Sequence, residues 1–139
     1  RWDSLGEFCA LGESLTFLAD AKGNEKARVL GEAVDAATQG ILDNNRSPSR
    51  KVNEHDNRDS HYWFARYWAD ALVAQGDDAE LAAHFGPIAD ALAKNETAIL
   101  AELMAAQGPA VDLGGYFHGD TAKTAAVMRP SKTLNGIIG

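Results

Sequence analysis

Apolar residues recur every three or four positions along most of the chain, the spacing that places side chains on one face of a helix. The first set comprises Leu5, Phe8, Leu11, Leu15 and Leu18. Gly23 predicts the end of this first helix, and Asn24 can cap a second helix that keeps the same spacing up to Asp43. The first 43 residues therefore predict two amphipathic helices in succession.

The next stretch, residues 44–57, has no such spacing and contains Pro48 among several serines and asparagines, so we expect a long exposed loop. A third helix follows and is predicted to end at Gly76. Its apolar face carries large side chains, and we expect this helix to form the centre of the core. These residues are Trp63, Phe64, Tyr67, Trp68, Ala71 and Leu72.

Local signals also mark a fourth helix. Asp77, with Glu80 three residues later, resembles a capping box and predicts where this helix begins. Gly86 and Pro87 predict a kink or short break, because proline lacks a backbone N–H and crowds the preceding turn. Beyond this break the helical pattern continues up to Gly108.

The last part of the chain predicts an irregular connection over residues 110–119 and a final helix between Asp120 and Pro130. No pair of segments alternates apolar and polar residues as strands do. The prediction is an all-α bundle of about five helices with one long basic loop. We expect residues 1–139 to form a single helical segment.

Composition narrows the class of protein. With 45% hydrophobic and 24% charged residues, the chain is typical of globular proteins. A net charge of −7 argues against a nucleic-acid partner, and no apolar run approaches the roughly 20 residues that cross a bilayer. Cys9 is the single cysteine and cannot close an internal disulfide, which favours a cytoplasmic location. We expect Cys9 to be a small buried hydrophobic residue.

The predicted loop is basic within an acidic chain. Arg46, Arg50 and Lys51 lie within residues 44–51, where there is no acidic residue. Arginine can hold phosphate oxygens through paired hydrogen bonds, and serine hydroxyls add further donors. The loop therefore indicates an anion site, with a merely solvated basic loop as the alternative.

Histidine and carboxylate side chains gather just before the aromatic helix. His55, Asp59 and His61 raise the hypothesis of a small metal-binding protein. Their spacing, however, matches no zinc or calcium motif. Capping of the aromatic helix by Asp or Asn is the explanation that the pattern favours.

Several longer stretches resemble the carboxy-terminal part of the monomeric-type NADP-dependent isocitrate dehydrogenases. The resemblance covers the whole chain in order and spacing. The stretches are residues 1–8 (RWDSLGEF), 42–52 (LDNNRSPSRKV), 56–58 (DNR), 60–61 (SH), 67–69 (YWA), 115–116 (GY) and 128–131 (MRPS), with Asn135 near the end.

This resemblance implies oxidative decarboxylation of isocitrate to 2-oxoglutarate by a larger α/β enzyme, with NADP as cofactor and Mg or Mn on the substrate. It implies that Arg1 and Arg50 contact the 2′-phosphate of NADP and that Asp3 lies beside the adenosine end. The isocitrate and metal ligands would lie in the remainder of the parent enzyme chain. We therefore expect these 139 residues to be inactive alone.

Three residues depart from the family pattern. Asn53 and Asp59 stand where the family has glycine, and His55 stands where it has an aliphatic residue. Because glycine often marks a positive φ or a close backbone approach, these changes predict a reshaped loop or altered cofactor use. Asp59 in particular would place a negative charge near any phosphate held by Arg50.

A different class of function also fits the pattern. A free-standing helical module could keep the fold without the activity and bind another protein through its aromatic or acidic faces. The chain starts at Arg1 rather than at methionine, and its first helix follows almost at once. This start favours a piece of a longer polypeptide over a free-standing module.

Overall fold

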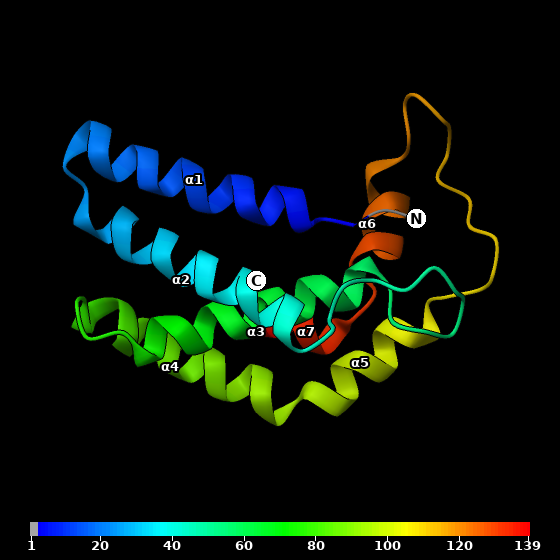
Figure 1. Ribbon diagram of the computed structural model, residues 1–139. Helices are drawn as coiled ribbons and strands as arrows, with labels where there is room; N and C mark the ends of the chain where they lie inside the picture. The colour runs from blue at the N-terminus through cyan, green and yellow to red at the C-terminus, as the bar shows by residue number, and fades with distance from the viewer. Residues whose placement is uncertain (1–2) are drawn as a thin grey trace.

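The computed structural model describes residues 3–139 and is all-helical (Figure 1). Within these residues there are seven helices and no strand. Their bounds are α1 (Leu5–Lys22), α2 (Glu25–Asp43), α3 (Asn57–Ala74), α4 (Ala79–Lys94), α5 (Glu96–Ala105), α6 (Thr121–Met128) and α7 (Lys132–Ile138). The predicted all-α class is confirmed. The count rises from about five to seven because the fourth predicted helix is divided and a short helix follows Pro130.

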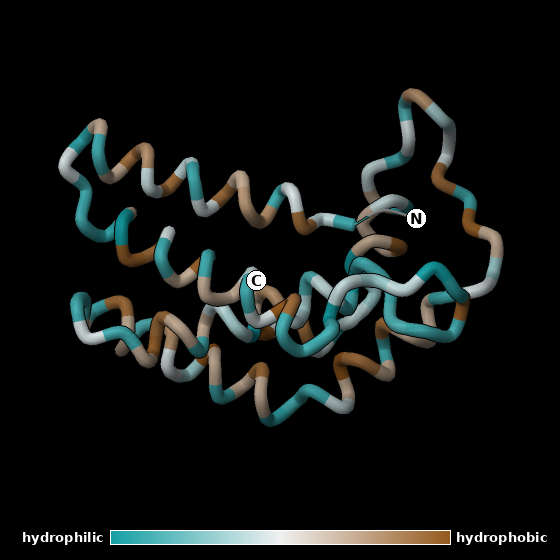
Figure 2. The backbone as a smooth tube through the Cα atoms, viewed as in Figure 1, coloured by the Kyte–Doolittle hydropathy of each residue, from teal (hydrophilic) through white to brown (hydrophobic). Residues whose placement is uncertain are grey.

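Helices α1 to α4 each pack against the next one in the sequence and run back and forth (Figure 1). Hydrophobic positions recur along all four (Figure 2). At the crossing of α2 and α3, the Cα of Gly40 lies so close to the Tyr67 ring that an added Cβ would be 2.9 Å from Cδ2. The missing side chain therefore allows this close packing.

The first two helices end and begin as the sequence predicts. Gly23 has φ 62°, a left-handed conformation that glycine adopts without strain, and ends α1. The Asn24 side chain accepts a hydrogen bond from the Ala27 N–H and caps α2. Both boundaries therefore follow from local residues.

The start of α4 differs from the prediction by one residue. Asp78, rather than Asp77, is the N-cap, and its side chain accepts from the Leu81 N–H at 2.9 Å. The reason lies in Gln75, whose Oε1 accepts from the N–H groups of both Asp77 and Asp78. This contact holds Asp77 in the preceding turn.

Of the kink or short break predicted at Pro87, the break is wrong, since α4 runs through this residue to Lys94. Ala83, whose carbonyl loses its usual helical donor, and Pro87 are both exposed, so water can satisfy that carbonyl. The chain breaks instead at Asn95, whose Nδ2 donates to the Ala91 carbonyl at 2.9 Å. The Asn95 backbone N–H donates to the same carbonyl, so this carbonyl in the last turn of α4 accepts two hydrogen bonds.

The core centres on α3, as the aromatic pattern predicts. Tyr62, Trp63 and Phe64 are all buried, and Phe8 from α1 stacks on Phe64 with ring centroids 4.0 Å apart. The Tyr62 hydroxyl donates to the Leu92 carbonyl at 3.0 Å, which ties α3 to α4. Burial raises the pKa of this hydroxyl to about 12.

The buried face of α1 is narrower than predicted. It presents Phe8, Gly12 and Ala19 to the bundle, whereas Leu11 and Leu18 are exposed. Cys9 is also exposed, so the expectation of a buried cysteine is wrong. Because α2 is its main neighbour, α1 is covered by the bundle on one side only.

The end of the chain is fastened to α5 by one carboxylate. Glu102 accepts hydrogen bonds from the Ser131 hydroxyl at 2.6 Å and from both the N–H and the hydroxyl of Thr133. These donors lower the pKa of Glu102 below its usual range.

In the described part of the chain, no helix is both long and apolar enough to cross a membrane.

Candidate functional site

A pocket of about 330 Å³ lies where the α2–α3 loop, the start of α3, the end of α5 and α6 meet. We call residues 44–56 the basic loop; it forms one wall of this pocket. The lining comprises Ser49, Arg50, Lys51, Val52, Asp56, Asn57, Arg58, Ala106, Gln107, Gly108, Pro109, Val111, Val127 and Met128.

The basic loop has a defined backbone path. The Ser49 N–H donates to the His55 carbonyl at 2.8 Å and closes the loop on itself. Asn53 has φ 65°, the left-handed conformation that glycine favours and asparagine tolerates. Asn53 therefore adopts the backbone conformation that a glycine at this position would favour.

The three cations of the basic loop have different surroundings. The Arg46 guanidinium stacks on the Trp63 ring, 3.8 Å from its centroid. Lys51 pairs with Glu54 at 3.7 Å. Arg50 is exposed, lines the pocket and has no hydrogen bond or ion pair to any residue in the described part of the chain. Of the three, Arg50 is the cation available to an anionic ligand.

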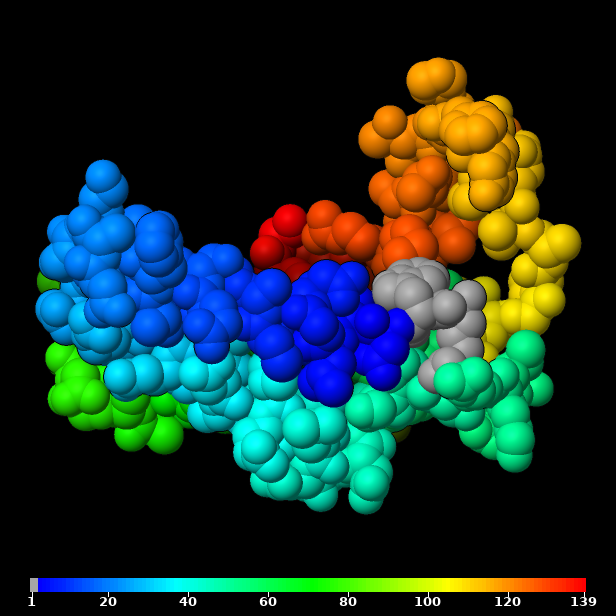
Figure 3. Space-filling model, turned by 45° about the horizontal axis from the view of Figure 1, so that its top comes forward, coloured from blue at the N-terminus to red at the C-terminus, as the bar shows by residue number. Residues whose placement is uncertain are grey.

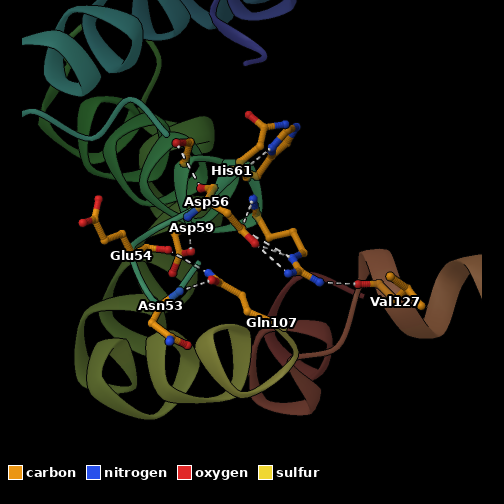
Figure 4. Close-up of polar contacts among 10 residues, drawn as sticks. Asn53, Glu54, Asp56, Asp59, His61, Gln107 and Val127 are labelled. Atoms are coloured by element: carbon orange, nitrogen blue, oxygen red, sulfur yellow. Dashed lines mark hydrogen bonds and ion pairs between the residues drawn. The ribbon is translucent and has the colours of Figure 1, made fainter. Parts of the chain in front are cut away.

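Gln107, just after α5, holds the tip of the basic loop (Figure 4). Its Oε1 accepts from the Asn53 N–H and its Nε2 donates to the Glu54 carbonyl, both at 2.8 Å. The side-chain amide thus accepts from one residue of the loop and donates to the next. This pairing fixes the loop against the opposite wall of the pocket.

Arg58 connects two walls of the pocket from the first turn of α3. Its Nε donates to Asp56 Oδ2 at 3.0 Å, and its NH2 donates to the same oxygen at 2.6 Å. Its NH1 donates to the Val127 carbonyl in α6 at 2.9 Å. Burial alone would raise the pKa of Asp56, but Arg58 and backbone donors outweigh it and hold that pKa below its usual range.

Asp59 does not face the pocket, which corrects the expectation of a negative charge beside Arg50. Its carboxylate is buried and accepts from the Asp56 N–H at 2.8 Å. Asp56 and Asp59 together form the capping box of α3, so the capping interpretation is confirmed. Burial raises the pKa of Asp59 above its usual range.

The three residues of the metal hypothesis make separate contacts. His55 Nε2 bonds to the Ser47 carbonyl and His61 Nδ1 to the Asn57 carbonyl, while Asp59 caps α3. Over residues 3–139, no group of three or more His, Cys, Asp or Glu side chains is placed to hold a metal ion. The structure does not bring these three together.

Asp3 lies close to the same end of α3. Its Oδ1 accepts from the Leu5 N–H at 3.0 Å, while the next residue, Ser4, exchanges two hydrogen bonds with Asn57. Asn57 lines the pocket, so the start of the chain and the basic loop approach one site. Arg1, the second predicted phosphate ligand, lies outside the described residues.

Sequence reasoning missed the parts played by two residues. Arg58 belongs to the DNR stretch, but nothing local signals its contact with Val127, 69 residues away. Gln107 has no sequence signal at all, because its partners lie 53 and 54 residues earlier.

Comparison with known proteins connects this site to a family. The sequence profile of the family described as monomeric isocitrate dehydrogenase matches residues 1–139. The chain belongs to the monomeric isocitrate dehydrogenase family. This membership bears out the resemblance drawn from the sequence motifs.

Curated relatives in this family are NADP enzymes by name. The chain is 56% identical over 138 residues to the isocitrate dehydrogenase (NADP) 2 of Colwellia maris and 56% identical to the isocitrate dehydrogenase (NADP) of Azotobacter vinelandii. It is 53% identical to the isocitrate dehydrogenase (NADP) 2 of Mycobacterium tuberculosis. These matches cover 99% of this chain but only 18–19% of each relative. The chain thus spans about a fifth of the length of its monomeric isocitrate dehydrogenase relatives.

Proposed function

We propose that residues 1–139 form the cofactor-side segment of an NADP-dependent isocitrate dehydrogenase, which converts isocitrate to 2-oxoglutarate by oxidative decarboxylation. The observation that carries this proposal is the exposed guanidinium of Arg50 on the pocket wall, with no ion pair among residues 3–139. The relatives' printed names specify NADP, which supports this choice of cofactor.

Arg50 fits the 2′-phosphate, the group that distinguishes NADP from NAD. A guanidinium can donate two parallel hydrogen bonds to phosphate oxygens, and such charge-assisted bonds are among the stronger ones in proteins. Bound NADP would supply the hydride acceptor for the reaction. At about 330 Å³ the pocket is near the lower limit for ligand pockets, so it fits one end of a dinucleotide rather than all of it.

Asp3 and Arg1 complete the proposed adenosine end. The hydrogen bonds between Ser4 and Asn57 bring the start of the chain to the pocket, which supports a place for Asp3 near the adenosine. Arg1 would be the second ligand of the 2′-phosphate. Asp3 Oδ1 already accepts a hydrogen bond from the Leu5 N–H. Its other carboxylate oxygen would therefore be the one that faces the adenosine.

The chemical step belongs to the remainder of the polypeptide in this proposal. Oxidative decarboxylation needs Mg or Mn to polarise the substrate and a base to take the hydroxyl proton. We assign both, together with the isocitrate ligands, to the four-fifths of the relatives' length outside this segment. The cytoplasmic location inferred from the single cysteine is part of the same proposal.

The test is titration of the complete polypeptide and its Arg50→Ala variant with NADP and with NAD. One charge-assisted hydrogen bond contributes about 1.5–3 kcal/mol, so we expect NADP binding to weaken about ten- to a hundredfold and NAD binding to change far less. Lys94→Ala, which removes an exposed cation at the end of α4, is the matched control. Equal losses for the two cofactors would show that Arg50 acts through folding instead.

A further inference from the structure

The segment between α5 and α6 stands away from the helical body. We call residues 109–120 the arm; in Figure 3 it projects from the molecule with α6 behind it. Residues 110–120 are all exposed. Tyr116 and Phe117 at its tip are 94% and 88% exposed, an unusual position for two adjacent large rings.

The arm nevertheless has a fixed shape. The Asp120 N–H donates to the Leu113 carbonyl at 2.7 Å, and Asp112 pairs with Lys123 of α6. Gly114 has φ 80°, and a Cβ there would lie 2.8 Å from the Asp120 Cβ, so the turn requires glycine. These contacts close the base of the arm and present the two rings together.

The exposed surface of the arm is apolar well beyond its tip. Val111 and Leu113 of the arm and Met128 of α6 are also exposed, by 48%, 38% and 40%, and α6 has no buried residue. The hydrophobic positions of the arm are visible in Figure 2. Exposed large apolar side chains gathered on one segment favour an interaction site over a solvated loop.

We propose that the arm docks onto the remainder of the same polypeptide. The relatives are about five times longer than this chain, so most of the complete protein has still to be placed against it. Pro109 and Val111 of the arm, with the preceding Gly108, also line the pocket beside Arg50. If the remainder of the polypeptide packs on the arm, it therefore lies beside the pocket and can form a further wall of it.

This inference rests on the length of the relatives and the exposed rings, and not on the proposed role of Arg50. It can be tested by placing a photo-crosslinking benzophenone amino acid at Phe117 in the complete polypeptide. We expect intrachain crosslinks to residues outside the 139-residue segment, mapped by mass spectrometry. The matched control carries the same amino acid at Lys94, an exposed charged position at the end of α4, and should give no such product. Crosslinks to a second copy, or none outside the segment, would overturn the proposal.

A second measurement needs no substitution. Chymotrypsin cleaves after exposed aromatic residues, so a free arm is cut quickly after Tyr116 or Phe117. If the arm is docked, cleavage of the folded complete polypeptide at these bonds should be no faster than its global unfolding. Rapid cleavage at these two bonds in the native protein would contradict docking, whether or not NADP binds at Arg50.

Discussion

Gln107 and Asn53 are 54 residues apart, yet the Gln107 side chain accepts a hydrogen bond from the Asn53 N–H at 2.8 Å. The same amide donates to the next carbonyl, that of Glu54. The N–H of Asn53, which has a left-handed backbone, and the carbonyl of Glu54 therefore both face Gln107. Gln107 therefore holds the loop that carries Arg50 without touching Arg50 itself.

We expect Gln107→Ala to weaken NADP binding by the complete polypeptide about five- to thirtyfold. Two exposed hydrogen bonds contribute about 1–2 kcal/mol together, and their loss lets the basic loop move away from the pocket. Isothermal titration would measure the change. Gln39→Ala, which removes an exposed hydrogen bond to Asp43 within α2, should leave the affinity unchanged. An unaltered affinity in Gln107→Ala would show that the loop is held by its own contacts.

The capping box predicts that two isosteric substitutions, Asp56→Asn and Asp59→Asn, change the free energy of unfolding in opposite directions at neutral pH. The lowered pKa of Asp56 means that its ionised form stabilises the folded state above pH 3.8, and that this contribution is lost as the pH falls through the lower folded pKa. The raised pKa of Asp59 means that protonation favours folding, so stability from this residue is gained as the pH falls towards 3.8.

Asp56→Asn should therefore lower the free energy of unfolding at neutral pH, with the deficit disappearing in acid. Asp59→Asn should raise it at neutral pH, since the amide oxygen can still accept from the Asp56 N–H, with the gain disappearing below pH 3.8. Urea denaturation from pH 3 to 8 measures both profiles. Parallel profiles for the two variants would contradict the opposite pKa directions.

Close packing at Gly40 predicts that an added methyl group destabilises the α2–α3 contact. The new Cβ would lie 2.9 Å from Tyr67 Cδ2, and overpacking of this kind costs about 1–3 kcal/mol. Gly6→Ala in α1 is the matched control, because no atom lies within 4 Å and alanine favours helix by up to about 1 kcal/mol. Thermal unfolding should therefore shift in opposite directions for the two variants.

The segment by itself should not reduce NADP in the presence of isocitrate and magnesium. In our proposal its pocket receives only one end of the cofactor, and the base and the metal ligands belong to the remainder of the enzyme. Absorbance at the wavelength of reduced nicotinamide measures this directly. Turnover by the purified 139-residue chain would refute this division of roles.

Features that depend on neighbouring residues could be predicted from the sequence. The end of α1 at Gly23, the cap at Asn24 and the aromatic core of α3 all follow from short-range patterns. The basic character of the loop could likewise be predicted, since it needs only the clustering of cations. The family motifs then singled out Arg50 among them.

Features that depend on distant contacts could not be predicted. The continuity of α4 through Pro87 depends on which face of the helix meets water, and the position of its first residue depends on Gln75. The buried orientation of Asp59 follows from the geometry of the capping box. In each case a single tertiary contact or solvent exposure decides between local alternatives.

The range of these contacts also orders the assembly of the segment. Helices α1 to α4 pack with their sequence neighbours, whereas the pocket is closed by pairs 53, 54 and 69 residues apart. Non-local contacts form late because a long loop must first be closed. During synthesis from the amino end, the Arg50 loop therefore waits for Gln107 and then for Val127 to leave the ribosome. A nascent chain can pack α1 to α4 together well before the contacts that close the pocket are available, and α7 joins α4 and α5 last.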